Sequence, residues 1–315
     1  MTVTVAQISQ YHSNGFLLVE NLFSPQELAP SMADIEDIVD SIAESLHADG
    51  RIVNKHREKE IHTRLTAIDS ECPSAGLMPL LESAMGPRLT ELWCAPKLLD
   101  IVERIIGPDI DGHPIFALRG KTPRTRLMTV PWHQDTAYLL GDCGDTDQPA
   151  AWIPFIDATR ETGCMQVVRG VHRERRVFRH HLENRKGDPR SWYIYIDEKD
   201  LPENAIVTCE MTMGSVLFIS QHTPHRSLEN HSDKIRWSID VRWQTPSLPT
   251  GVGDDGFRPL RMRRSDNPSF KPDPVGWFEW YAARGRDERV NYDGLTDRDP
   301  FEVDLNDAKW LDRWR

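Results

Sequence analysis

GSVLFISQHTPHRSLENHSDKIRWSIDVRW, residues 214–243, contains two strand-like runs separated by a polar connection. The first run, 215–220, is mostly apolar, which is typical of a buried strand. In the second run, 236–243, four apolar residues alternate with four polar ones: Trp237, Ile239, Val241 and Trp243 against Arg236, Ser238, Asp240 and Arg242. The simplest interpretation exposes the polar face to solvent. We instead expect it to line the interior of a jelly roll, where Arg236 would meet a buried anion.

Short strand-like segments also lie upstream of this stretch, between turns formed by Gly, Pro and Asp. In addition to 215–220 and 236–243, we predict strands at 115–119, 126–130, 151–157, 163–168 and 206–211. Many short strands with irregular connections and no internal repeat are typical of an antiparallel sandwich or a jelly roll. The predicted fold class is therefore mainly β, with a jelly-roll core and added helices.

The first hundred residues have the pattern of helices around a short strand. Ser24 has the position of a helix N-cap, Pro25 that of the first helical residue, and Glu27 that of the capping-box partner. Apolar residues then recur at three- and four-residue spacing: Leu28, Met32, Ile35, Val39, Ile42 and Leu46. Residues 76–107 predict one or two further helices, which end at Gly107. We expect these helices to cover a sheet.

Length and composition favour a single domain over residues 1–315. No linker rich in Gly or Ser divides the chain, and 39% apolar with 28% charged residues is ordinary for a soluble protein. We expect a mostly helical part at 1–110, a jelly-roll core at 114–245 with an insert at 169–200, and a tail at 246–315 packed on the domain. Four tryptophans are expected to anchor that tail: Trp277, Trp280, Trp310 and Trp314.

Charge and cysteine content limit the partners and the compartment. The net charge of −11 argues against nucleic acid, whose phosphates select basic surfaces. No apolar run approaches the length of about 20 residues that spans a bilayer. The amino terminus lacks a basic segment followed by an apolar one, so we expect no signal peptide. The five cysteines are scattered without a CxxC pair, which suits reduced thiols and predicts a cytoplasmic protein.

Two histidines and one aspartate have the pattern of a metal site. His133 and Asp135 are two residues apart, a spacing that points both side chains the same way on a strand or at its end. The third ligand must come from another strand, where His225 and His222 compete. We prefer His225 because the eleven-residue interval to Arg236 fits a hairpin that places both residues on neighbouring strands. His222 is expected to pack or to support a ligand by a hydrogen bond.

This set of side chains suits a particular chemistry. Two imidazoles and a carboxylate are the facial triad of non-haem Fe(II) oxygenases, which leaves three positions open for oxygen and a chelating cosubstrate. Arg236 adds a planar guanidinium that can bind a carboxylate through two hydrogen bonds, as a cosubstrate with two carboxylates requires.

Taken together, the motifs resemble the phytanoyl-CoA dioxygenase family over about residues 10–245. The matching stretches are PWHQD at 131–135, Trp152, ETGCMQVVRGVH at 161–172, and HRS at 225–227 followed by Asn230, Ser232 and Arg236. The resemblance implies a double-stranded β-helix that depends on Fe(II), 2-oxoglutarate and O2. The loop at 169–172 departs from the usual family sequence.

The resemblance also implies roles for individual residues. It assigns iron binding to His133, Asp135 and His225. It assigns the distal carboxylate of 2-oxoglutarate to Arg236 with the help of Ser227. Trp152 is expected to line the cosubstrate pocket. Lys121 resembles a family lysine near the pocket rim, while a solvated lysine is the alternative.

The expected reaction is hydroxylation of an unactivated carbon in a small organic substrate, with release of succinate and CO2. Halogenating relatives lack the carboxylate ligand, whereas Asp135 is present here. Desaturation, epoxidation and cyclisation use the same triad and stay open. So do a zinc or manganese enzyme of the cupin type and a catalytically silent binding protein. The sequence does not define the substrate or the oligomeric state.

Other conspicuous residues have structural interpretations beside functional ones. Gln134 and Trp132 are expected to pack, and His172 has the character of a loop histidine. The basic stretch 169–190 is either a lid for an anionic substrate or a solvated loop paired with acidic neighbours. Three aspartates are expected in a loop beside the site rather than in a calcium site: Asp142, Asp145 and Asp147.

Overall fold

A large antiparallel sheet dominates the computed structural model, which describes residues 3–73, 75–81, 84–126, 128–139, 143, 146–182, 193–252 and 258–284. Within these ranges the sheet has six strands in the order β1-β8-β3-β10-β2-β11. Their bounds are β1 Phe16–Val19, β2 Ile110–Lys121, β3 Ala150–Pro154, β8 Val216–Ile219, β10 Arg236–Gln244 and β11 Leu260–Arg263. The long strand β10 lies between β2 and β3, and its pairing with both sets the register of the site.

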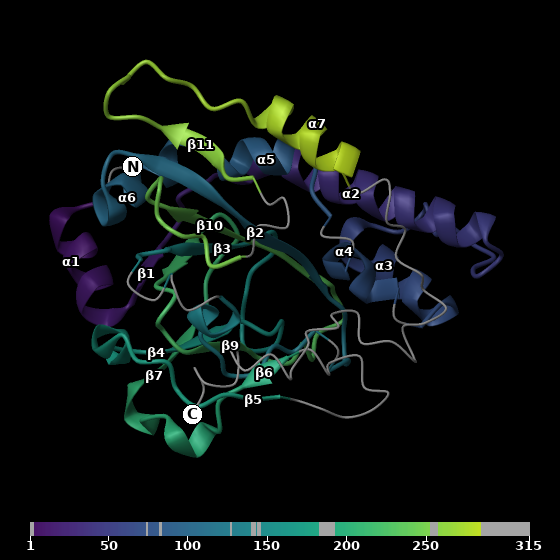
Figure 1. Ribbon diagram of the computed structural model, residues 1–315. Coiled ribbons are helices and arrows are strands. Elements are labelled where there is room, and N and C mark those ends of the chain that lie inside the picture. Colours follow the sequence, from purple (N-terminus) through teal and green to yellow (C-terminus); the bar gives the residue numbers. More distant parts are fainter. Residues whose placement is uncertain are drawn as a thin grey trace.

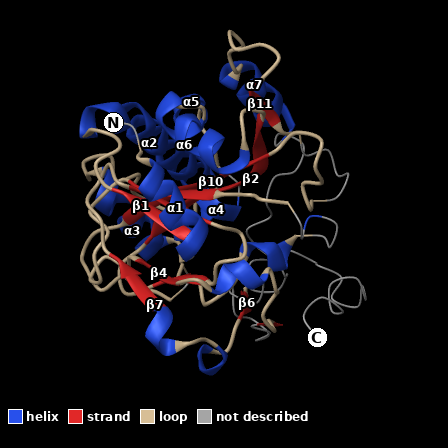
Figure 2. Cartoon of the chain, turned by 90° about the vertical axis from the view of Figure 1, so that its left-hand side faces the viewer, coloured by secondary structure: helices blue, strands red, loops and turns tan. Residues whose placement is uncertain are grey.

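A smaller sheet lies on the other side of the interior from the helices. It comprises β7 (Ile206–Cys209), β4 (Met165–Val168) and β9 (His225–Ser227), in that order. His133 adds to its edge through an isolated antiparallel bridge with His225. Figures 1 and 2 show β4 and β7 on one side of the large sheet and the main helices on the other. Two facing antiparallel sheets form the predicted jelly-roll core.

Two sequence expectations about this region are wrong. The described residues of the run 126–130, which are 126 and 128–130, form no strand, and Met128 lies in a turn. Pro131 follows this segment and has no N–H to donate to a strand ladder. Val130 is joined to Ser227 of β9 by two hydrogen bonds: Ser227 N–H donates to the carbonyl of Val130, and Val130 N–H donates to the Ser227 hydroxyl, each at 3.1 Å.

The second correction concerns the chain between His225 and Arg236. The two residues do not lie on neighbouring strands, because β9 belongs to the small sheet and β10 to the large one. The connection crosses between the sheets and is closed by Asn230, whose Nδ2 donates to the carbonyls of Lys121 and Lys234 at 2.8 and 2.7 Å. The histidine and the arginine therefore face each other across the interior instead of standing side by side.

The helices cover the outer face of the large sheet. Figure 1 shows α2 (Pro25–Ala48), α5 (Pro87–Trp93), α6 (Pro96–Ile106) and α7 (Pro274–Arg284) along that face. The apolar face of β10 packs into the same core as these helices, through Trp237, Ile239, Val241 and Trp243. The polar face of β10 is thereby turned into the interior, as predicted.

Local sequence signals explain the helix boundaries. The capping box of α2 forms as predicted between Ser24 and Glu27. The described residues between 76 and 107 hold three α-helices rather than one or two, because Pro87 and Pro96 each begin a new one: α4 (Met78–Leu81), α5 and α6. The remaining described α-helices are α1 (Val5–Asn14) and α3 (Ile61–Glu71), and a short pair of strands is formed by β5 (His181–Leu182) and β6 (Ile194–Tyr195).

The chain after residue 245 is fastened to the core in two ways. β11 pairs with β2, so the large sheet extends past the expected end of the core. Trp277 on α7 is buried against Trp93 and Phe116, with ring centroids 5.3 and 6.1 Å away, and Trp280 packs at the edge of the same cluster. Trp310 and Trp314 lie outside the described residues.

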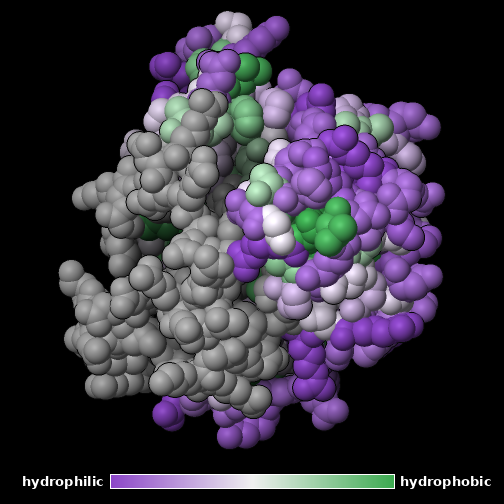
Figure 3. Space-filling view, turned by 90° about the vertical axis from the view of Figure 1, so that its right-hand side faces the viewer, coloured by the Kyte–Doolittle hydropathy of each residue, from purple (hydrophilic) through white to green (hydrophobic). Residues whose placement is uncertain are grey.

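The described surface is largely polar. Figure 3 shows a mainly hydrophilic face with small, separate apolar patches among the coloured residues. Among the helices in the described ranges, none has the length and apolar character that crossing a membrane requires.

Candidate metal centre and the pocket around it

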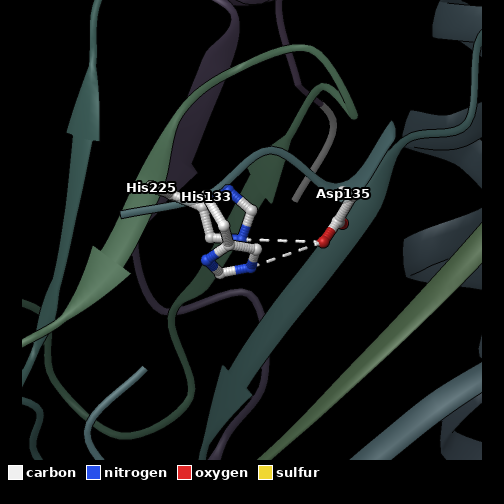
Figure 4. A group of neighbouring side chains, drawn as sticks. All are labelled: His133, Asp135 and His225. Carbon is white, nitrogen blue, oxygen red and sulfur yellow. Dashed lines mark ion pairs between the residues drawn. The ribbon is translucent and has the colours of Figure 1, made fainter. Parts of the chain in front are cut away.

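Three predicted side chains converge in the interior. Nε2 of His133 and Nε2 of His225 lie 3.7 and 3.8 Å from the same oxygen, Oδ1 of Asp135. The two rings lie side by side with centroids 4.2 Å apart, and Asp135 faces them from the opposite side (Figure 4). All three residues are buried, and their ligand atoms lie within 4.8 Å of one another. His222, the alternative third ligand, is not part of this group.

The backbone fixes how each histidine presents its ring. Nδ1 of His133 donates to the carbonyl of Pro131 at 2.8 Å, and Nδ1 of His225 donates to the carbonyl of Thr223 at 2.9 Å. With the proton on Nδ1, the lone pair of each Nε2 points into the centre. Burial and the neighbouring His225 hold the pKa of His133 well below its ordinary value. The Nε2 atoms of both histidines thus face one carboxylate oxygen.

Sequence analysis missed the partner of the carboxylate, Arg242. Its Nε and Nη2 both lie 3.0 Å from Oδ2 of Asp135, which leaves Oδ1 directed at the histidines. Burial by itself raises the pKa of Asp135. The charge of Arg242, followed by His225 and His133, lowers this pKa by more than burial raises it, so the pKa lies below its ordinary value. Arg242 was visible in the alternating pattern on the same face as Arg236, although the pattern could not reveal its partner.

The polar network continues from Arg242 along the sheet. Nη1 of Arg242 lies 3.4 Å from Oδ2 of Asp240, and Nε of Arg119 donates to Oδ1 of the same aspartate at 3.0 Å. Arg119 stands on β2 opposite Ser238, and its side chain therefore shares the inner face with the polar residues of β10. The strand pairing places two more charged groups in the wall of the pocket.

Arg236 is a buried cation on the same face. Only 1% of it is exposed, and its guanidinium lies 4.8 Å from the centre of the Trp152 ring. Nη1 donates to Ser238 at 3.3 Å, while Nε is buried without a hydrogen-bond partner. In the described part of the chain, no carboxylate forms an ion pair with Arg236. Burial, and then the charge of Arg119, lower its pKa to about 9, so the site favours an anion beside it.

Ser227 and Lys121 lie next to this cation. The hydroxyl oxygen of Ser227 accepts hydrogen bonds from Lys121 Nζ at 2.7 Å and from Val130 N–H at 3.1 Å, which leaves its own proton free to donate. Lys121 is fully buried, so the solvated-lysine alternative is wrong. Burial, followed by the charges of Arg236 and Arg119, holds its pKa well below the ordinary value.

All six predicted site residues line one pocket. His133, Asp135 and His225 share its wall with Trp152, Ser227 and Arg236, and the additional charged residues are Arg119, Asp240 and Arg242. A donor set of two imidazole nitrogens and one carboxylate oxygen fits Fe(II). The partnerless guanidinium and the available hydroxyl fit a carboxylate. The residues thus suit both groups that the sequence implied.

Three residues that were expected to have packing or loop roles make structural contacts: Gln134, Trp132 and His172. Gln134 is buried and joins two segments: its Nε2 donates to the carbonyl of His222 at 2.7 Å, and its Oε1 accepts from Phe178 N–H at 2.7 Å. Trp132 packs with Phe178 and stacks under Arg226. His172 lies against α1, where its Nε2 donates to the carbonyl of His12 at 3.1 Å.

The basic stretch is described as far as residue 182. There, Arg175 pairs with Asp147 at 2.6 Å and Arg176 with Glu174 at 2.9 Å. These pairs favour the interpretation of a solvated loop. The rest of the stretch, 183–190, and the aspartates Asp142 and Asp145 lie outside the described residues.

Comparison with solved structures shows the fold. A non-heme monooxygenase, ThoJ in its apo form, is similar with a TM-score of 0.60 and 20% identity, over 89% of this chain and 95% of that one. EvdO2 from Micromonospora carbonacea var. aurantiaca, complexed with 2-oxoglutarate, is similar with a TM-score of 0.53 and 19% identity, over 82% of this chain and 97% of that one.

Sequence comparison shows the family. The model of the phytanoyl-CoA dioxygenase family matches residues 11–238. An ectoine dioxygenase of Bordetella parapertussis is 24% identical over 279 residues, which are 84% of this chain and 83% of the relative. The peroxisomal phytanoyl-CoA dioxygenase of Mus musculus is 23% identical over 243 residues, 76% of this chain and 68% of the relative.

With the triad and the pocket in place, these matches define a class: the protein is an Fe(II)- and 2-oxoglutarate-dependent oxygenase. Within that class, the chain belongs to the phytanoyl-CoA dioxygenase family.

Proposed function

We propose that the enzyme hydroxylates an unactivated carbon of a small organic substrate and releases succinate and CO2. In this proposal His133, Asp135 and His225 hold the iron. Arg236 and Ser227 bind the distal carboxylate of 2-oxoglutarate. Trp152 lines the cosubstrate pocket.

The observation that carries the proposal is the buried guanidinium of Arg236. A cation that is only 1% exposed to water needs an anion as a direct partner, and no carboxylate of the described residues forms an ion pair with it. A carboxylate placed there could accept from Arg236 Nε and from the Ser227 hydroxyl. A zinc or manganese enzyme of the cupin type would have no use for this unpaired cation beside the same three ligands.

Each residue then has a physical task. When bound, iron and 2-oxoglutarate supply the oxidising chemistry, which activates O2. Nε2 of each histidine and Oδ1 of Asp135 would hold the metal, while Arg242 binds Oδ2 of Asp135 and fixes the orientation of the carboxylate. Val130, Met165 and Ile219 add an apolar wall that limits the access of water.

The retained carboxylate Asp135 favours hydroxylation over halogenation. Desaturation, epoxidation and cyclisation are alternative outcomes of the same site, and product analysis separates them. The five cysteines are all buried and free, which supports a reducing compartment, and we place the enzyme in the cytoplasm.

The test uses anaerobic protein loaded with Fe(II) and 2-oxoglutarate. The expected result is a weak metal-to-ligand charge-transfer band, followed by succinate release when O2 and a screened metabolite extract are added. His133→Ala and Asp135→Ala should abolish both signals. His172→Ala is the matched control, since His172 contacts α1 and is not among the residues that line the pocket, and it should keep both.

Absence of the band with both components present would remove the basis of the proposal. A band with no succinate release from any extract would instead favour a silent binding protein.

A further inference from the structure

The pocket carries one more positive charge than it neutralises. Three of its lining residues are cations, Arg119, Arg236 and Arg242, and two are anions, Asp135 and Asp240. The two histidines count as neutral because metal ligands must be deprotonated. The two charges of a ferrous ion cancel the two of 2-oxoglutarate. If the proposed function holds, on which this inference rests, one positive charge is left in the loaded pocket.

The unmatched charge is located at Arg119. Among the described residues its one carboxylate partner is Asp240, which also binds Arg242, so two guanidiniums share one carboxylate. Nη1 of Arg119 is buried and has no hydrogen-bond partner among the described residues. A buried donor of a charged group is costly to leave unsatisfied, and an incoming acceptor relieves that cost.

Arg119 has other partners in the pocket than Arg236, the cosubstrate clamp. Arg236 pairs across the strands with Lys121 and lies against Trp152, whereas Arg119 stands opposite Ser238 and is bonded to Asp240. Burial lowers the pKa of Arg119, but Asp240, Tyr193 and Tyr138 together raise it above the ordinary value.

Tyr138 indicates on which side of the metal centre Arg119 lies. Its ring packs edge-on against His133, with centroids 5.6 Å apart. Arg119 is therefore near the tyrosine that borders the triad, while the Trp152 side is assigned to 2-oxoglutarate.

We propose that Nη1 of Arg119 binds the carboxylate of an organic-acid substrate. The substrate then carries a single negative charge, which balances the loaded pocket. The guanidinium fixes the orientation of the acid relative to the metal centre, and Asp240 holds the guanidinium in place through Nε.

The experiment compares acids with their neutral counterparts. Anaerobic enzyme with Fe(II) and 2-oxoglutarate is titrated with a panel of aliphatic and aromatic monocarboxylic acids and with the matching primary amides. Binding is read from a shift of the charge-transfer band and from tryptophan fluorescence, so no turnover is needed. Acids from the panel should bind at least about tenfold more tightly than their amides, as expected for a charge-assisted hydrogen bond.

Arg119→Gln should remove this preference for acids and leave the affinity for 2-oxoglutarate within about twofold of wild type. Arg119→Lys keeps the charge without the planar fork and should keep part of the preference. Arg160→Gln removes an equal charge at the surface, where the side chain is 65% exposed, and should change neither.

Three results would overturn the proposal: equal binding of acids and amides, no binding by any acid, or a loss of 2-oxoglutarate affinity in Arg119→Gln as large as in Arg236→Gln. The last would show that Arg119 contacts the cosubstrate. Failure of the proposed function is distinguishable, because the charge-transfer band would then be absent before any acid is added.

Discussion

Two nitrogens of Arg242 bind one oxygen of Asp135, each at 3.0 Å, and thereby divide the carboxylate into two halves. Oδ2 is occupied by the guanidinium, while Oδ1 faces both histidines at 3.7 and 3.8 Å. A carboxylate held in this way is prepared to bind a metal through one oxygen. Its orientation is set before any metal arrives, which lowers the cost of ordering it on binding.

Arg242→Gln should therefore weaken Fe(II) binding by about 10- to 100-fold, the usual effect of removing a hydrogen-bond partner from a metal ligand. Competition with a metal-binding dye under anaerobic conditions measures this directly. Arg242→Lys, which can still bond to Oδ2, should recover part of the affinity. Equal metal affinity in wild type and Arg242→Gln would show that the contact does not orient Asp135 for metal.

Arg236→Gln should act on the cosubstrate instead. Removing one partner of a buried charge pair costs about 2–5 kcal/mol, so the 2-oxoglutarate concentration for half-saturation should rise by about 30-fold or more. Fe(II) affinity should change little. The titration is followed by the charge-transfer band, and Ser227→Ala serves as a milder companion with an expected rise of about tenfold. An equal loss of metal and 2-oxoglutarate affinity in Arg236→Gln would contradict the assigned role.

Gln134→Leu should make residues 176–178 more mobile, because the Gln134 side chain bonds this segment to the chain between His133 and Asp135. The amide of Phe178 loses its acceptor at Gln134 Oε1, so its hydrogen exchange should become faster by about tenfold or more. The amide of Leu217 in β8 is the internal reference and should keep its rate. Unchanged exchange at Phe178 would mean that other contacts hold this segment.

Trp277→Ala should lower the free energy of unfolding by about 3–5 kcal/mol, the range for truncating a large buried aromatic side chain. Trp277 is 3% exposed and packs on Trp93 and Phe116, which connects α7 to α5 and to β2. Chemical denaturation followed by circular dichroism gives the value. Trp280→Ala is the comparison, and it should cost less because Trp280 is only partly buried. Equal losses of unfolding free energy in the two variants would show that Trp277 is not the main contact that holds α7 on the core.

Local sequence patterns predicted much of this molecule because their causes are local. The capping box at Ser24 and Glu27 depends on a spacing of three residues, and it forms as predicted. The alternation along β10 depends only on strand geometry, and it correctly assigned Arg236 to the interior. The HxD spacing and the preference for His225 over His222 led to the group that converges.

Errors arose where a distant segment decides the outcome. The run 126–130 has strand-like residues, but its described residues form no strand and are joined to β9 through Val130 and Ser227. The eleven-residue interval suggested a hairpin, yet the chain crosses to the other sheet between His225 and Arg236. No local rule distinguishes a hairpin from such a crossing, because the pairing partners lie far away in sequence.

The amino-acid sequence by itself determined the ligand types, the inward face of β10 and the class of chemistry, since these follow from side-chain identity and strand periodicity. Only the tertiary structure decided which charges meet. Arg242 binds Asp135 across 107 positions of the chain, and Arg119 reaches Asp240 across 121. Such pairs depend on strand register and on burial that removes water from competing for the same hydrogen bonds, and neither quantity is contained in a local stretch of sequence.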